Sequence, residues 1–173
     1  AYRRQRQMCI RDSFVVHLVT NIEAKRRYSN IPNLIIDTVF GTRPKEEILA
    51  FLGAIDFLIM PSLAEGFGLP IIEANSMGTL AIHGAFPPLT EVSDLENNIV
   101  FNYNDVRFVN TGEGIEYEFH IYDPKELADS MEKAIELKLK YKSELEDREE
   151  KVKRAIDRFN AELLYSKLIG MVK

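Results

Sequence analysis

The stretch Phe57-Leu-Ile-Met-Pro-Ser-Leu-Ala-Glu-Gly-Phe-Gly-Leu-Pro-Ile-Ile-Glu73 decides the fold that the sequence predicts. Its first four residues form an apolar run with the length of a buried strand, and a glycine-rich turn follows. Gly66 and Gly68 allow the backbone to adopt positive φ and to approach a ligand closely. Pro70 suits the first turn of a helix, and the free amides at that helix start favour an anion. We therefore predict a strand, a turn and a helix that together hold a sugar diphosphate.

Two carboxylates, Glu65 and Glu73, flank this helix start. Glu65 falls in the turn, where it can meet sugar hydroxyls. Glu73 falls about one turn into the helix, where it can reach ribose hydroxyls, and a carboxylate can accept two hydroxyls together. The structural alternative is that both acids bind no ligand and only stabilise the helix, by interacting with the positive end of its dipole. The spacing alone leaves the two interpretations open.

Strand and helix patterns alternate along the chain. Short apolar runs predict strands at 14–19, 34–40, 57–60, 79–82 and 98–101, and helices are expected at 44–53 and 69–77. This alternation is typical of an α/β fold with a Rossmann-like parallel sheet covered by helices on both faces. Ligands of such sheets bind beyond the carboxyl ends of the strands, which is where the turn with Glu65 falls.

Residues 62–78 resemble the Glu-x7-Glu signature of retaining glycosyltransferases with the GT-B fold, particularly family 4 (group 1). The resemblance extends to 54–61, similar to the strand before that motif, and to Pro88-Leu-Thr-Glu-Val92, similar to the family's Gly-Leu-Pro-Glu-Val turn. It includes the helix start at 123–128 and covers residues 34–139. It implies that residues 14–173 are the C-terminal, nucleotide-sugar-binding domain of a GT-B enzyme, incomplete at its N-terminus and ending in C-terminal helices.

The resemblance also implies roles for individual residues. Glu73 would bind the ribose of a UDP- or GDP-sugar, and Glu65 would face the donor sugar as the candidate catalytic residue. The backbone around the turn would lie near the diphosphate and the transferred sugar, a part carried by Gly66, Phe67, Gly68 and Leu69. Family members generally transfer sugar without a bound metal, so no metal or other cofactor is expected.

The implied enzyme is a hexosyltransferase that moves a hexose to a glycan or lipid-linked acceptor, which an absent N-terminal domain would bind. The family's Arg/Lys pair for the leaving diphosphate has no counterpart here. Lys25, Arg26 and Arg27 form the nearest basic cluster, but such clusters are usually solvated. We therefore expect no transferase activity from the chain alone. Two alternatives remain open: a glycogen synthase- or phosphorylase-like enzyme, and a non-catalytic sugar-nucleotide-binding or scaffolding module of the same fold.

Composition limits the other classes of function. The chain has 173 residues, of which 46% are hydrophobic, enough for one well-cored domain. Its net charge of −5 disfavours nucleic acid as a partner. No apolar run approaches the roughly 20 residues that span a bilayer. The single cysteine, Cys9, excludes an internal disulfide, so we expect a cytoplasmic protein. Peripheral association of the parent enzyme with the inner face of the membrane is compatible with this.

The first thirteen residues differ from the rest in composition. Residues 1–13 carry four arginines, have no hydrophobic period and resemble translated sequencing-adapter read-through. We expect this segment to be non-native or disordered. The alternative is a basic arm that binds an acidic lipid surface or a partner weakly.

Residues 103–122 depart from the family pattern, and within them residues 106–121 predict a hairpin with a glycine-containing loop. Glu116, Glu118 and His120 would share one strand face. Three such side chains could bind a metal, but ligands normally converge from several elements, so a solvated polar face is the preferred interpretation. The hairpin itself is expected to be a lid or a contact element.

The C-terminal part is predicted to be helical. Apolar residues at helical spacing should pack on the sheet: Leu127, Met131, Ala134, Ile135 and Leu139. A charged helix with acid-first pairs four residues apart follows (Glu144–Arg148, Asp147–Lys151, Glu149–Lys153 and Glu150–Arg154), and an amphipathic helix spans 159–172.

Three residues outside the motif receive structural roles. His83 is expected to pack or support the cleft, His17 to be a core residue, and Glu91 to anchor its loop.

Overall fold

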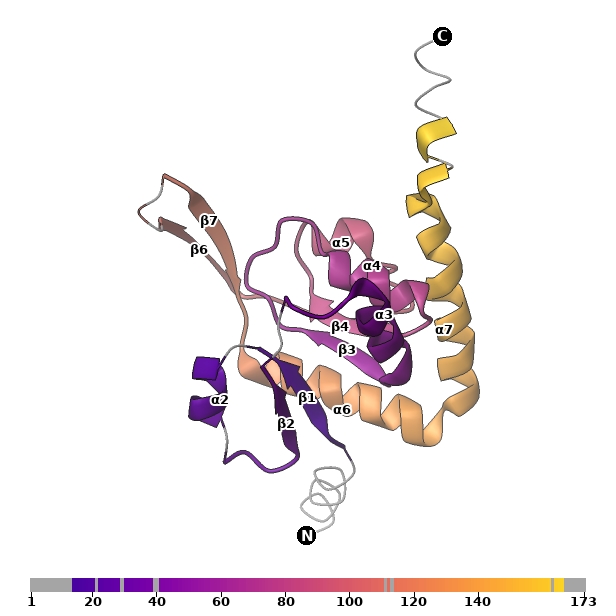
Figure 1. Ribbon diagram of the computed structural model, residues 1–173, viewed down its shortest axis with the longest axis horizontal. Coiled ribbons are helices and arrows are strands. Elements are labelled where there is room, and N and C mark those ends of the chain that lie inside the picture. The colour runs from indigo at the N-terminus through magenta and orange to yellow at the C-terminus, as the bar shows by residue number, and fades with distance from the viewer. Residues whose placement is uncertain are drawn as a thin grey trace. The chain divides into compact units, whose positions relative to one another are not determined.

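The computed structural model describes residues 14–20, 22–28, 30–38, 41–110, 112, 114–162 and 164–166, which divide between two compact units, residues 1–48 and 49–173. Figure 1 shows the elements of each unit. Each unit is described by itself. The predicted basic segment 1–13, including Cys9, lies outside the described residues.

The first unit contains a parallel β-α-β arrangement. Strand β1 (Val16–Val19) pairs with β2 (Leu34–Asp37), and helix α2 (Ile22–Tyr28) connects them. The predicted strands are present but shorter than expected. The prediction that His17 is a core residue is wrong, because alternate side chains of β1 are exposed and His17 points to the exposed side. Its Nε2 lies 3.8 Å from a carboxylate oxygen of Asp37.

The second unit is built on a parallel sheet of three strands in the order β3–β4–β5. These are β3 (Phe57–Met60), β4 (Leu80–Gly84) and β5 (Ile99–Phe101). Every residue of the central strand β4 is buried, because strands flank it and helices cover both of its faces. The predicted α/β fold with parallel strands is confirmed.

Helices cover the two faces of this sheet (Figure 1). On one face α4 (Leu69–Ser76) and α5 (Leu89–Val92) contribute to a core of Met60, Ile71, Ala81, Phe86 and Leu89. On the other face α6 (Pro124–Lys140) and α7 (Lys142–Ala155) bury Leu80, Ile82, Phe101, Ala134, Leu137, Leu145 and Val152. Helix α3 (Lys45–Ala54) contains the boundary between the two units.

The apolar stripe of α6 was predicted correctly except at its end. Leu127 and Met131 pack against the core and Ala134 is buried, but Leu139 is 64% exposed. Leu137 takes the predicted place of Leu139, because it lies three residues after Ala134 and therefore on the same helix face. None of the described helices is long and apolar enough to cross a bilayer.

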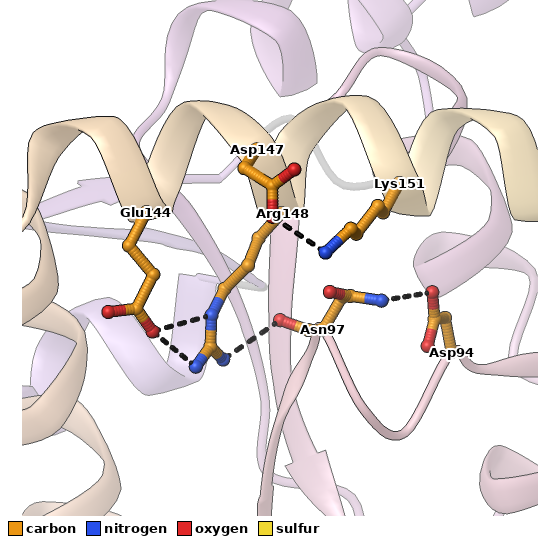
Figure 2. Close-up of polar contacts among 6 residues, drawn as sticks. All are labelled: Asp94, Asn97, Glu144, Asp147, Arg148 and Lys151. Carbon is orange, nitrogen blue, oxygen red and sulfur yellow. Dashed lines mark hydrogen bonds and ion pairs between the residues drawn. The ribbon is translucent and has the colours of Figure 1, made fainter.

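Helix α7 is a charged helix, as predicted. Glu144–Arg148 and Asp147–Lys151 form ion pairs of 2.6 Å, and Glu150–Arg154 forms one of 3.9 Å. Figure 2 shows the first two pairs on the same side of the helix. Among the described residues the fourth predicted pair, Glu149–Lys153, is not formed. Glu149 is half-buried, and that burial raises the pKa of its carboxyl.

The predicted hairpin is present. Strands β6 (Asp105–Asn110) and β7 (Glu116–Ile121) pair antiparallel and project from the second unit (Figure 1). At the C-terminal end, a 3₁₀ turn η1 (Ile156–Phe159) follows α7. Residues 161–162 and 164–166 are helical, and the rest of the predicted final helix lies outside the described residues.

Candidate functional site

The turn between β3 and α4 has the geometry that its sequence predicts at one of its two glycines. Gly68 is the N-cap of α4 with φ 90° and ψ 33°, and Pro70 occupies the first turn. A Cβ at Gly68 would stand 2.9 Å from Leu89 and 3.2 Å from Val92. Only glycine therefore fits this position. Gly66 does not use the positive φ that glycine allows, and a Cβ there would meet nothing within 4 Å.

Glu65 lies in the turn, as predicted, and is held by a neighbouring hydroxyl. The side chain is half-buried, and Ser62 Oγ donates a hydrogen bond of 2.7 Å to its Oε1. Phe67, two residues later, is 48% exposed. Because Ser62 occupies one carboxylate oxygen, Glu65 is oriented while its other oxygen remains available to a ligand.

Glu73 lies on α4, about one turn after the helix start, and is half-buried. Within the described part of the chain, neither Glu73 nor Glu65 forms an ion pair with a basic side chain. Both carboxylates therefore remain free to accept hydroxyl donors. The structure brings all six predicted site residues together along one connection, from Glu65 through Gly66, Phe67, Gly68 and Leu69 to Glu73.

The segment after β4 packs against this turn. Leu89 and Val92 of α5 are buried next to Gly68, and the Pro87–Pro88 peptide bond is cis. Glu91 is exposed, and the contact that anchors its loop is made by its backbone carbonyl, which accepts a hydrogen bond from Arg158. Glu91 therefore anchors its loop, as predicted, and it does so through its backbone carbonyl.

A buried polar network lies behind this segment. His83 is fully buried, and its Nδ1 and Nε2 lie 2.9 Å from Gly84 O and 2.7 Å from Ser93 Oγ. The carbonyl can only accept, so Nδ1 donates to it and Nε2 accepts from the Ser93 hydroxyl. Burial lowers the pKa of His83, and hydrogen bonding to the Gly84 carbonyl opposes that shift. The predicted packing role of His83 is confirmed.

Two asparagines extend the network to α4. Asn98 Nδ2 donates to Ser93 Oγ at 2.9 Å, and the amides of Asn75 and Asn98 exchange hydrogen bonds of 3.1 and 2.9 Å. The Asn98 side chain also accepts from the backbone N–H of Ala81 in β4 at 2.7 Å. The sequence analysis missed these residues. The local signal for a buried amide is weak at both positions. Asn75 is an amide in an otherwise largely apolar helix, and Asn98 comes directly before the apolar strand β5.

The base of the hairpin braces the loop that precedes Glu65. The His120 backbone N–H donates to Leu63 O at 2.7 Å, and Tyr122 Oη donates to Pro61 O at 3.0 Å. The His120 ring stacks on Phe86 with centroids 4.2 Å apart. The hairpin therefore joins the domain next to the candidate site.

The predicted solvated face of the hairpin is correct for Glu116 and Glu118 and wrong for His120. Only 6% of His120 is exposed, because it lies where β7 enters the domain and Tyr103 covers its other side. Its buried Nδ1 has no hydrogen-bond partner within the described part of the chain. Among the described residues, no group of three or more His, Cys, Asp or Glu side chains is arranged to hold a metal ion.

Comparison with known proteins identifies the family of this chain. Residues 38–156 match the family described as glycosyl transferases group 1. The chain is also 31% identical over 134 residues to "Uncharacterized glycosyltransferase 335" of Sulfolobus islandicus rod-shaped virus 1. That match covers 75% of this chain and 38% of the viral protein, so the chain spans about two-fifths of its relative's length. The region that matches the family, residues 38–156, contains the whole turn from Glu65 to Glu73.

Proposed function

The chain belongs to the group 1 glycosyltransferases, and from this membership we propose that it is the donor-binding domain of a retaining enzyme of family 4 with the GT-B fold. The parent enzyme moves a hexose from a UDP- or GDP-sugar to a glycan or lipid-linked acceptor. It works in the cytoplasm, with peripheral attachment to the membrane where the acceptor is lipid-linked.

The observation that carries the proposal is the placement of Glu65 and Glu73 on either side of the Gly68 turn. Gly68 carries no side chain where α4 begins, and it is buried against α5. Pro70 has no N–H, and the Ile71 N–H donates to Gly68 O at 3.1 Å. Leu69 therefore supplies the amide of the first helical turn that has no intrahelical partner. Amides at a helix start bind phosphate oxygens well, because they donate hydrogen bonds along the helix dipole. The donor diphosphate therefore lies against the backbone of Phe67, Gly68 and Leu69.

The two carboxylates then have different partners. Glu73 accepts hydrogen bonds from the ribose hydroxyls, since it lies one turn along α4 from the phosphate position. Glu65 accepts from hydroxyls of the transferred sugar, in the orientation that Ser62 sets. Hydrogen bonds to a carboxylate are stronger than neutral ones, so each contact contributes to donor affinity. Neither role requires a metal.

The chain alone is proposed to bind donor without transferring sugar. It spans 38% of the viral relative's length, and catalysis in a GT-B enzyme takes place between two domains. The acceptor domain is the remaining requirement. Turnover of a UDP- or GDP-sugar by the purified chain would contradict this part of the proposal.

The test is isothermal titration calorimetry of the chain with UDP, GDP, UDP-glucose and GDP-mannose. We expect saturable binding of one nucleotide series and a loss of about 10-fold or more in Glu73→Ala, since a hydrogen bond to a charged group is removed. Glu96→Gln, an exposed acid in the connection before β5, is the matched control and should bind normally. A folded chain that binds none of the four compounds would refute the donor-binding proposal.

A further inference from the structure

The C-terminal end of the described chain contacts the candidate donor site through two residues, Arg158 and Phe159 of η1. They follow the region that matches the glycosyltransferase family, which ends at residue 156. The sequence analysis assigned them no role. Both contact elements that lie more than sixty residues earlier in the chain.

Phe159 packs against the glycine-rich turn itself. Its ring lies edge-on to that of Phe67, with centroids 6.5 Å apart and an interplanar angle of 76°. This is a favourable aromatic arrangement. Phe67 stands between the two glycines and is 48% exposed, so few other contacts hold its side chain. Phe159 thus limits the positions available to the segment just before Gly68.

Arg158 holds the neighbouring segment. Its Nη2 donates to Glu91 O at 3.0 Å and to Ser93 O at 3.4 Å, at the end of α5. The guanidinium carbon also lies 4.7 Å from the centroid of the Phe159 ring, which favours both side chains in these positions. Since α5 carries the Val92 side chain that packs against Gly68, Arg158 supports the turn from behind.

Arg148 of α7 contacts the far end of the segment that begins at Glu91, the residue bonded by Arg158. Arg148 Nη1 donates to Asn97 O at 3.4 Å while its guanidinium pairs with Glu144 (Figure 2). Asn97 in turn donates to Asp94 at 2.7 Å. Arg148 and Arg158 therefore hold the two ends of the segment from Glu91 to Asn97, as α7 and η1 pass alongside it.

We propose that Arg158 and Phe159 are positioning residues for the donor diphosphate. They hold the Phe67–Gly68 turn and the α5 segment behind it in the conformation that presents the backbone amides to the phosphates. This inference rests on the proposed donor-binding function. It adds two residues from beyond the family match, which act through Phe67 and the Glu91–Ser93 backbone rather than by touching the donor.

The position of the contacts predicts a selective effect. In this proposal the turn faces the phosphates and the transferred sugar, whereas Glu73 holds the ribose from α4. Although η1 also lies against α4, the ring contact of Phe159 is with Phe67. The hydrogen bonds of Arg158 are with Glu91 and Ser93. Loosening the turn should therefore weaken nucleoside diphosphate binding more than nucleoside monophosphate binding. A merely structural role would weaken both alike.

The experiment compares Phe159→Leu and Arg158→Gln with matched controls on exposed residues of the same region, Tyr165→Leu and Arg154→Gln. Affinities for UDP and UMP, or for GDP and GMP, are measured by calorimetry on the full chain. We expect the diphosphate affinity to fall about 3- to 10-fold and the monophosphate affinity by less than about 2-fold. Arg158→Lys keeps the charge but loses the forked donor, and should show an intermediate loss.

Hydrogen exchange of the backbone amides at residues 67–69 and 91–93 gives a readout that needs no ligand. Faster exchange at these amides in Phe159→Leu and Arg158→Gln, but not in the controls, supports the proposal. Unchanged exchange with unchanged diphosphate affinity overturns it. Equal losses for diphosphate and monophosphate together with a lowered melting temperature also overturn it, because they indicate a general loss of stability.

The result for the unmodified chain separates the two proposals. If the unmodified chain binds no nucleotide, the donor-binding function fails and the positioning role fails with it. If the unmodified chain binds but the η1 variants bind equally well, only the positioning role is overturned.

Discussion

The β3–α4 turn and the β6–β7 hairpin are two glycine-containing connections of the same unit, and they are held in different ways. The turn is fixed at Gly68, which is buried against α5, and the partly exposed Phe67 contacts Phe159 of η1. In the described part of the hairpin, the anchoring contacts lie at its base, through His120 and Tyr122, and its far part is exposed on both strands. The comparison shows that glycines indicate a turn in both places, whereas only the tertiary structure packs other elements against Gly68 and leaves Gly112 in open space.

The largest effect is expected from adding one methyl group at each turn. Gly68→Ala combines positive φ with a Cβ 2.9 Å from Leu89, so it should reduce the free energy of unfolding by about 2–4 kcal/mol. Gly112→Ala in the hairpin has φ 83° but open space around the Cβ, so the cost should be about 1 kcal/mol. Urea unfolding of both variants measures the difference. Equal losses would show that packing adds nothing at Gly68.

A pH titration tests the buried network behind the turn. In the unfolded chain His83 titrates near its ordinary value of 6.5, and burial lowers its pKa in the folded chain. Below 6.5 the unfolded state therefore binds a proton that the folded state does not. The stability present at higher pH should fall with decreasing pH by up to about 1.4 kcal/mol per unit, until the folded-state pKa is reached.

His83→Gln is the variant that isolates this contribution. Its unfolding free energy, measured by urea titration between about pH 7.5 and about pH 5.5, should fall less steeply than that of the unmodified chain. Asn102→Gln, at an exposed amide that does not titrate, is the control variant and should leave the slope unchanged. Identical slopes in the unmodified chain and His83→Gln would contradict the assignment.

His120 tests how the hairpin is anchored. Its ring fills a space between Phe86 and Tyr103, and its Nδ1 is buried without a partner. His120→Phe keeps a ring in this space and removes the unpaired Nδ1. It also removes Nε2, which lies 3.4 Å from Oε1 of the exposed Glu118, but an exposed contact of this kind contributes little. We therefore expect a gain of about 1 kcal/mol in unfolding free energy. His120→Ala, which leaves a cavity, should instead destabilise the chain by about 2 kcal/mol or more. Thermal unfolding followed by circular dichroism distinguishes the two signs, and a destabilising His120→Phe would indicate a hydrogen-bonding role.

The smallest effect is expected at the exposed part of the hairpin. Phe108 is 64% exposed on β6, so Phe108→Ser should change the unfolding free energy by no more than about 0.5 kcal/mol. The same melting experiment checks this, with Phe101→Ser in the core as the contrasting variant. A large loss in Phe108→Ser would show that the hairpin is packed in solution.

Local patterns predicted much of the fold. The strands, the helix that starts at Leu69 and the hairpin were all predicted from short stretches of sequence. The signals were runs or alternation of apolar residues and the positions of glycine and proline. The candidate site was predictable for the same reason, because Glu65, Gly68 and Glu73 lie within one strand–turn–helix unit. Asp123, whose side chain accepts from Lys125 N at the start of α6, is a further local signal that the structure confirms.

What the sequence by itself determined is therefore the α/β alternation, the turn and its two acids, since each depends on neighbours along the chain. Only the tertiary structure decided that His120 is buried, that His17 is exposed, and that Arg158 and Phe159 reach the turn. These outcomes depend on contacts between residues as much as 92 positions apart, as between Phe67 and Phe159. No period or spacing in the sequence encodes such contacts, because burial depends on which surface the folded chain brings against each side chain.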